Sequence, residues 1–223
     1  MNFELIGEML PGLVAEGMLN TVILTVGGFS LGLVLGLMVA LLRLSKFRPV
    51  RWTAAVYIEL FRGLPLLLTV LFIGTGVPLL MQGFRWPDLR IPGLLALGIV
   101  AGAYIAETVR AGIQAVPRGQ MEAARSLGMP FPTAMRTIVL PQAFRIIIPP
   151  LTNELVLLIK DTSLLTVLGT SVGQREILKF SRDVFGRTFD TSAYIAAGLA
   201  YLVLTVPMTR VVAVLEARNA RSR

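Results

Sequence analysis

The strongest constraint on this chain is a charge-free apolar stretch near its beginning. Residues 17–42 contain no Asp, Glu, Lys or Arg, and about 20 apolar residues suffice for a helix to cross a bilayer. Because lipid offers no partner to a free peptide group, such a stretch crosses as a helix. The chain as a whole agrees, since 55% of its 223 residues are hydrophobic and its mean hydropathy is +0.75. We therefore expect a polytopic membrane protein with a single domain over residues 1–223.

Further apolar stretches predict an all-α bundle of about five transmembrane helices. We place the spans at about 17–42, 53–80, 91–116, 142–160 and 191–209. Residues 1–16 carry three glutamates and are expected to form a short amphipathic lead-in at the membrane surface. Residues 161–190 contain an apolar run too short to cross, which predicts an interfacial segment, a re-entrant segment or one packed on the bundle.

Two features inside the spans bear on packing. Glycines recur every fourth residue at Gly28, Gly32 and Gly36, which predicts close approach of another helix, although glycine is abundant in membrane helices anyway. Glu107 and Arg110 lie three residues apart, so they are expected to pair on one face as the third span leaves the bilayer.

Arg62 stands beside Gly63 and Pro65 at the start of the second span. It fits a snorkelling interfacial arginine. It also fits a helix-end anchor beside a proline kink that moves during transport.

The distribution of lysine and arginine predicts the orientation, because cytoplasmic loops are enriched in these residues. The 13 residues of one side are Arg43, Lys46, Arg48, Arg51, Arg110, Arg118, Arg125, Arg136, Arg145, Arg210, Arg218, Arg221 and Arg223. The 6 residues of the other side are Arg85, Arg90, Arg175, Lys179, Arg182 and Arg187. We therefore expect the N-terminus outside, and the loop at 117–141 and the C-terminus inside.

Residues 117–141, which we call the elbow, form a polar connection between two spans. Arg118–Leu127 is rich in strong helix formers, and Gly128 stands where a left-handed residue would end that helix. Two prolines then prevent its continuation, and Thr133–Leu140 is expected to form a second short helix. The sequence predicts a helix-turn-helix.

The elbow has two readings on physical grounds. It fits a docking element for a partner groove, or a solvated hairpin that closes the bundle. The docking reading uses two small residues, two charges and three apolar anchors: Ala123, Ala124, Glu122, Arg125, Met121, Leu127 and Met129.

A family resemblance bears on this choice. Glu122-Ala123-Ala124, then Gly128, then Ile138-x-Leu140-Pro141 is the pattern of the EAA loop, and FRGLPLL at 61–67 is similar to an RGxPLL signature. In these motifs the chain resembles the permeases of ATP-binding-cassette importers. Its flanking residues are similar to those of the histidine, glutamine, arginine and glutamate subfamily. The likeness is strongest over residues 56–165.

The resemblance implies a type I importer permease in the inner (cytoplasmic) membrane. Two permeases, identical or paralogous, would sit on two ATPase subunits, and an extracellular solute-binding protein would deliver a polar amino acid. Residues Glu122, Ala123, Ala124, Arg125, Leu127 and Gly128 would couple to the ATPase. ATP and Mg are expected in that partner, since this chain has no GxxxxGK[ST] phosphate loop. We expect no cofactor, metal site or enzymatic activity in this chain.

Polar groups inside spans are costly and are therefore candidates for function. Asn153, Glu154, Asp161, Thr162 and Ser163 cluster along the fourth span and its end. Glu154 or Asp161 would receive the ammonium of an amino acid. Backbone amides freed near Pro149-Pro150, or the hydroxyls of Thr162 and Ser163, would receive its carboxylate. The alternative is structural: Lys160 pairs with Asp161, and Glu154 with a neighbouring helix.

Two other classes of function compete with an import subunit. A self-standing secondary carrier or channel is disfavoured by the small size, the elaborate elbow and the lack of inverted repeats. A membrane enzyme is disfavoured because the chain has neither histidine nor cysteine, and no set of nucleophile, base and oxyanion donor is visible.

Overall fold

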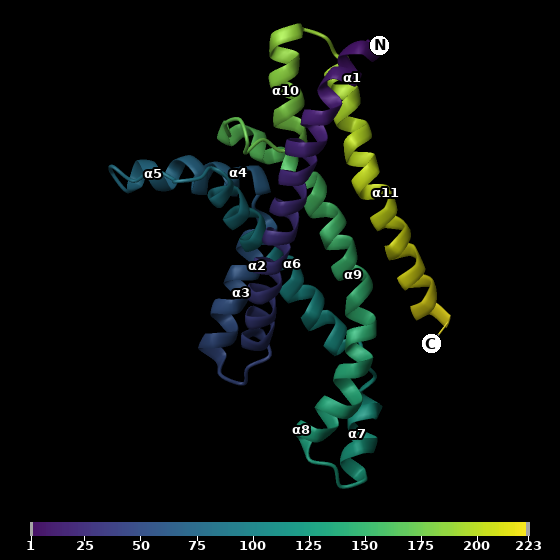
Figure 1. Ribbon diagram of the computed structural model, residues 1–223. Coiled ribbons are helices and arrows are strands. Elements are labelled where there is room, and N and C mark those ends of the chain that lie inside the picture. The colour runs from purple at the N-terminus through teal and green to yellow at the C-terminus, as the bar shows by residue number, and fades with distance from the viewer. Residues whose placement is uncertain (1, 222–223) are drawn as a thin grey trace.

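The computed structural model describes residues 2–221, in which every regular element is a helix (Figure 1). The helices are α1 (Phe3–Gly12), a π turn (Leu13–Met18), α2 (Leu19–Arg43), α3 (Arg48–Gly63), α4 (Leu66–Leu71), a π turn (Phe72–Gly76), α5 (Val77–Leu80), α6 (Arg90–Gln114), α7 (Arg118–Ser126), α8 (Phe131–Ala134), a π turn (Met135–Val139), α9 (Leu140–Asp161), a 3₁₀ helix (Thr162–Leu168), α10 (Ile177–Thr188) and α11 (Ser192–Arg221). Four helical runs are long and apolar enough to span a membrane, or five if one bent pair is counted. The all-α membrane bundle is confirmed.

The first helix begins earlier than expected. Helix α1, the π turn and α2 form one run of 41 residues from Phe3 to Arg43, so the lead-in expected at 1–16 is not a separate element but the start of the first long helix. Packing explains the difference. Met9 and Leu13 are buried in a cluster with residues of α10 and α11, which gives the early part of the helix partners of its own.

The second span is broken rather than straight. Helix α3 and the run from α4 to α5 meet at an angle of 104°, and α5 projects sideways from the bundle (Figure 1). Leu64 is extended, at φ −87° and ψ 140°, because a residue before proline avoids the helical region. Arg62 ends α3 with its guanidinium 5.4 Å from the centre of the Tyr104 ring.

The core is built on α2 against α6. A Cβ added at Gly32 would lie 2.8 Å from the Cβ of Ala101, and one at Gly36 would lie 2.7 Å from Ile105. A glycine of α6 makes the same kind of close contact with α2, since a Cβ at Gly98 would lie 2.5 Å from Leu31. The predicted glycine packing ridge is confirmed: the missing side chains let the two backbones meet.

The fourth span continues the elbow without a break. Residues 131–168 form one helical run of 38 residues. The second elbow helix predicted at Thr133–Leu140 is therefore helical as expected, but it continues into the fourth span and is not a separate helix. Pro141 would clash with the carbonyl four residues earlier in a regular helix. The π turn at Met135–Val139 widens the helix just before this proline.

The segment at 161–190 is a 3₁₀ helix followed by α10. Ile177 and Phe180 of α10 are buried in the same cluster as Met9 and Leu13. The apolar run lies ahead of α10 and begins in the 3₁₀ helix, where Leu165 is buried in the core cluster. Of the three alternatives for that run, packing on the bundle describes the 3₁₀ helix.

The loops divide between two ends of the molecule. The elbow and the α2–α3 turn lie toward one end, while α10 and the start of α1 lie at the other (Figure 1). Helix α11 runs from the α10 end toward the elbow end (Figure 1). The structure thus gathers the loops into the same two groups as the charge count, although Arg223 lies outside the described residues.

Candidate functional site: the elbow and the polar face of α9

Helix α7 ends in a complete Schellman turn. Gly128 has φ +85°, and its N–H donates to the carbonyl of Arg125 at 3.0 Å. The N–H of Met129 donates to the carbonyl of Ala124 at 3.1 Å. These are the two hydrogen bonds that define this motif, and the left-handed residue costs least when it is glycine. The predicted role of Gly128 in ending the helix is confirmed.

A side chain reinforces the same turn. The Arg125 guanidinium donates to the Met129 carbonyl at 2.9 Å. Arg125 is therefore less available to a partner than expected, because its guanidinium already donates a hydrogen bond to the backbone of the elbow.

The two faces of α7 differ. Ala124 is 2% exposed, and Met121 packs against the core cluster. On the other face, Glu122 and Ala123 are exposed, and Leu127 is 84% exposed. Met121 thus packs α7 on its own core and Ala124 is buried within the chain, which corrects the expectation that both present themselves to a partner. A partner would meet Glu122, Ala123 and Leu127.

A groove runs beside α7. Its volume is about 470 Å³. It is lined by Ile113, Gln114, Val116, Pro117, Arg118, Met121, Phe131, Met135 and Val139. The groove lies where the end of α6 meets the elbow, so an inserted side chain would contact both.

The polar residues of α9 lie beyond the elbow on the same helical run. Glu154 and Asp161 are seven residues apart and both half-buried, so they occupy one face of the helix two turns apart. Asn153 is exposed and Ser163 is half-buried. Thr162 is fully buried, and its hydroxyl donates to the Ile159 carbonyl at 2.7 Å, which makes it the least suited of the five to meet a substrate.

The structure tests one of the structural alternatives for these residues, the pairing of Lys160 with Asp161. Among the described residues 2–221, the ion pairs within 4 Å involve Arg90, Arg110, Arg175 and Lys179. The proposed pair of Lys160 with Asp161 is not among them. The predicted pair of Glu107 and Arg110 is present and confirmed.

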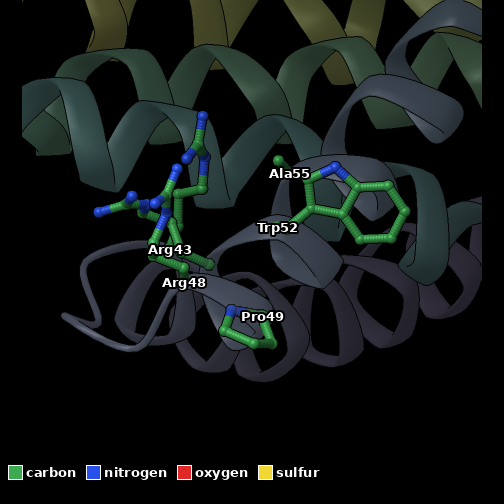
Figure 2. Close-up of a pocket in the computed structure, with 6 residues that line it drawn as sticks. Arg43, Arg48, Pro49, Trp52 and Ala55 are labelled. Carbon is green, nitrogen blue, oxygen red and sulfur yellow. The ribbon is translucent and has the colours of Figure 1, made fainter.

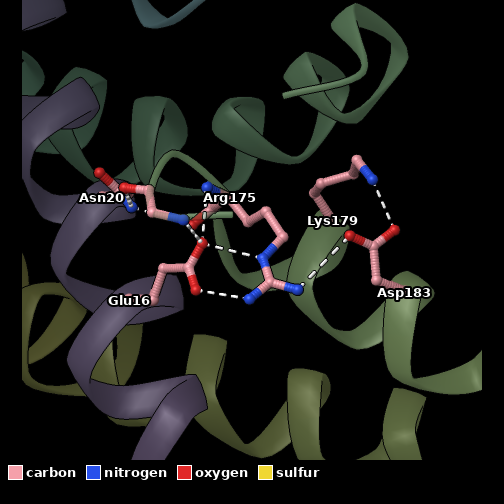
Figure 3. Close-up of polar contacts among 6 residues, drawn as sticks. Glu16, Asn20, Arg175, Lys179 and Asp183 are labelled. Carbon is pink, nitrogen blue, oxygen red and sulfur yellow. Dashed lines mark hydrogen bonds and ion pairs between the residues drawn. The ribbon is translucent and has the colours of Figure 1, made fainter. Parts of the chain in front are cut away.

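A buried polar network at the α10 end was missed by the sequence reasoning. The Arg175 guanidinium donates to Glu16 at 2.6 and 2.8 Å and lies 3.6 Å from Asp183 (Figure 3). Asn20 donates from its amide to the carbonyls of Gly173 and Arg175, each at 3.1 Å. Partners more than 150 residues apart leave no local signal in the sequence.

Hydrogen bonding and burial shift the pKa values of Arg175 and of the adjacent Glu176. The hydrogen bond to Glu16 raises the pKa of Arg175 above its ordinary value. Glu176 is 1% exposed, and burial raises the pKa of its carboxyl to about 7. Its hydrogen bonds from the N–H groups of Leu178 and Lys179 and from the Tyr201 hydroxyl act in the opposite direction, but desolvation prevails.

The helical bundle, the glycine-packed core and the polar elbow together define a transport permease of the ATP-binding-cassette type. The chain belongs to the family described as binding-protein-dependent transport system inner membrane component, whose model matches residues 32–221. Family and apolar helices together place it in the inner membrane as a multi-pass protein.

Several curated relatives are similar over most of their length. The probable glutamine ABC transporter permease protein GlnM of Bacillus subtilis is 40% identical over 93% of this chain and 93% of its own. The arginine transport system permease protein ArtQ of the same organism is 36% identical over 88% and 87%. The glutamate/aspartate import permease protein GltK of Escherichia coli is 34% identical over 92% of each.

Solved structures agree with the fold. A chain from an amino acid ABC transporter crystallised with histidines has a TM-score of 0.88 and 33% identity, over 98% of this chain and 99% of its own. A chain of the MetNI methionine ABC transporter has a TM-score of 0.74 at 18% identity, over 93% and 98%. The second likeness concerns the fold alone.

Proposed function

We propose that this chain is the subunit through which an ATP-binding-cassette importer carries a polar amino acid across the inner membrane. The observation that carries the proposal is the elbow: a short helix in which Met121 packs on the core and Ala124 is buried, with Glu122, Ala123 and Leu127 exposed. The relatives, which are named for amino-acid transport, support the substrate class.

The elbow suits the transmission of motion from a separate ATPase. Residues 131–168 form one helical run, so the second part of the elbow and Glu154 belong to the same continuous helix. At 1.5 Å per residue, the distance from residue 131 to residue 154 along the helix is about 35 Å. A displacement of the elbow by an ATPase that binds ATP and Mg would therefore move the polar face of α9.

The polar face of α9 is proposed to line the amino-acid path. Glu154 and Asp161 share this face and would attract the ammonium group, while Asn153 and Ser163 offer hydrogen bonds. Thr162 is buried and its hydroxyl already donates a hydrogen bond to the Ile159 carbonyl, so we assign it a structural role. The second permease of the pair, identical or paralogous, would complete the path.

The proposed orientation has the elbow and the C-terminus in the cytoplasm, and the α10 end toward an extracellular solute-binding protein. The charge count supports it, with 13 cationic residues on the elbow side against 6 on the other.

Reconstitution tests this function. The chain is placed in vesicles with its candidate ATPase and solute-binding protein, and uptake of radiolabelled glutamine, arginine, histidine and glutamate is measured with and without ATP. We expect uptake only in the complete, ATP-supplied system. Uptake by the chain alone under an ion gradient would instead identify a secondary carrier.

Two variants test the path in the same vesicles. Glu154→Gln and Asp161→Asn should each raise the concentration of amino acid needed for half-maximal uptake by about tenfold, which corresponds to ~1.4 kcal/mol of lost interaction. Glu59→Gln, at an exposed glutamate of α3, is the matched control. An unchanged concentration dependence in either path variant would remove that residue from the path.

A further inference from the structure

Three arginine side chains gather at the turn between α2 and α3 (Figure 2). Arg43 comes from the last turn of α2, and Arg48 and Arg51 come from the first turn of α3. They share a hollow of about 480 Å³, which Pro49, Trp52 and Ala55 complete. The turn therefore brings together cationic groups from two spans.

These arginines lack the carboxylate partners that three other arginines of the described residues have. In the described part of the chain, carboxylates lie within 4 Å of Arg90, Arg110 and Arg175. Arg43, Arg48 and Arg51 have no such ion pair and donate no side-chain hydrogen bond to any described residue. The charge of Arg43 acts electrostatically on the carboxylate of Glu107. That carboxylate already accepts a hydrogen bond from Arg110. Three cations so close together favour an external anion.

The backbone adds to the same preference. Helix α3 has 16 residues, and Phe47, its N-cap, provides no side-chain hydrogen bond to the helix start. The free N–H groups and the dipole of a helix N-terminus favour an anion, and phosphate in particular. This end of α3 opens onto the arginine hollow, because Arg48 and Arg51 belong to its first turn.

Exposed apolar side chains accompany these arginines along the chain. Trp52, which lines the hollow, is 68% exposed. Leu41, two residues before Arg43, is 70% exposed, and Phe47, next to Arg48, is 65% exposed. Trp52 suits the level of the headgroups in a membrane interface. A free phosphate would use only the arginines, whereas a phospholipid would cover the apolar side chains with its acyl chains as well.

We propose that this turn is a binding site for the headgroup of an anionic phospholipid. The phosphate lies among Arg43, Arg48 and Arg51 at the start of α3, and the acyl chains lie along Leu41, Phe47 and Trp52. Basic pockets beside transmembrane helices recognise anionic lipids through this combination of charge and interface. The inference does not depend on which solute the chain transports.

Native mass spectrometry of the purified full chain in detergent tests the site. The probes are phosphatidylglycerol and phosphatidylcholine with the same acyl chains, and inorganic phosphate as a competitor. Each basic residue near a membrane surface contributes about fivefold in affinity for anionic lipid, or ~1 kcal/mol. The chain should therefore prefer phosphatidylglycerol by at least about tenfold, and the triple variant R43Q/R48Q/R51Q should lose that preference.

The matched control removes the same charge elsewhere. Arg85, Arg182 and Arg187 are exposed and make no ion pair within the described residues, so R85Q/R182Q/R187Q should keep the preference. If the first triple variant fails to fold, Arg48→Gln alone should reduce the preference about fivefold. An unchanged preference in the arginine-turn variants, or an equal loss in the control, overturns the proposal. Full displacement of the lipid by inorganic phosphate would mean a free-anion site and would overturn it too.

Discussion

Gly128 determines how the chain turns at the end of α7 within the elbow. Its φ of +85° is a conformation in which a Cβ costs about 1–2 kcal/mol, and an added Cβ would meet nothing within 4 Å. The requirement for glycine is thus a matter of backbone conformation and not of space. A substitution here strains the turn that fixes the exposed face of α7.

Gly128→Ala should therefore weaken coupling without preventing insertion. We expect the stimulation of the partner ATPase by the permease to fall several-fold, because the strained turn displaces Glu122 and Leu127. Gly119→Ala is the matched control, since Gly119 lies within the helix and a Cβ there also meets nothing. ATPase assays on the reconstituted complex measure both, and equal loss in the two variants would argue against this role for the turn.

Glu176 is a second residue whose behaviour follows from its surroundings. Its carboxyl is buried beside the start of α10 and Tyr201, and the charge of Lys179 acts to lower its pKa. Its pKa of about 7 exceeds the ordinary 4.5. The folded state thus binds the proton more tightly than the unfolded state, so the contribution is fully present below pH 4.5 and is lost as pH rises through 7.

The free energy of unfolding should accordingly fall with pH over that window. A shift from 4.5 to about 7 corresponds to about 3 kcal/mol at 1.36 kcal/mol per pKa unit. Glu176→Gln should remove this slope, because glutamine does not titrate. Denaturant unfolding in detergent at pH 4.5 to 8 provides the measurement, with Glu8→Gln, an exposed glutamate on α1, as control. Equal slopes in wild type and Glu176→Gln would refute the assignment.

At the scale of elements, the packing of α2 against α6 holds the bundle together. A Cβ at Gly32 would lie 2.8 Å from the Cβ of Ala101 and 3.2 Å from the carbonyl oxygen of Gly98. The backbone cannot rotate away as a side chain can. The contact between these helices therefore depends on the absence of a side chain.

Gly32→Val should separate α2 from α6. Overpacking of this kind typically costs about 1–3 kcal/mol, so the midpoint of thermal unfolding in detergent should fall by several degrees. Gly198→Val is the matched control, because Gly198 lies in α11 and an added Cβ meets nothing within 4 Å. Tryptophan fluorescence reports both transitions, and a similar fall in the two variants would mean that contact with α6 is not the cause.

At the scale of the whole molecule, charge and architecture agree on two ends. The elbow and the α2–α3 turn occupy one end, and α10 occupies the other (Figure 1). The excess of lysine and arginine on the elbow side predicts that this end faces the cytoplasm.

Thiol labelling tests that orientation directly, because the chain has no cysteine of its own. Gly119→Cys in the elbow and Gly186→Cys in α10 both replace exposed glycines with open space around them. In intact spheroplasts a membrane-impermeant maleimide should label the second variant and spare the first. Lysed cells are the control, in which both should react. The reverse pattern in intact spheroplasts would invert the topology.

The sequence by itself determined the class of the protein, its all-α architecture, the glycine ridge and the end of α7. These properties follow from hydropathy, local spacing and backbone preference, which are readable within one or two helical turns. It also located the elbow by motif. Its error at residues 1–16 had a physical cause, since only contact with α10 and α11 extends the first helix beyond its apolar stretch.

Only the tertiary structure decided which groups meet. Glu16 and Arg175 pair across 159 residues, and the burial of Ala124 within its own chain reverses the role that its small size suggested. The 104° turn at Pro65 converts one apolar stretch into two helices. Such outcomes depend on which surfaces lie opposite one another, and desolvation and contact between distant segments have no counterpart in local sequence.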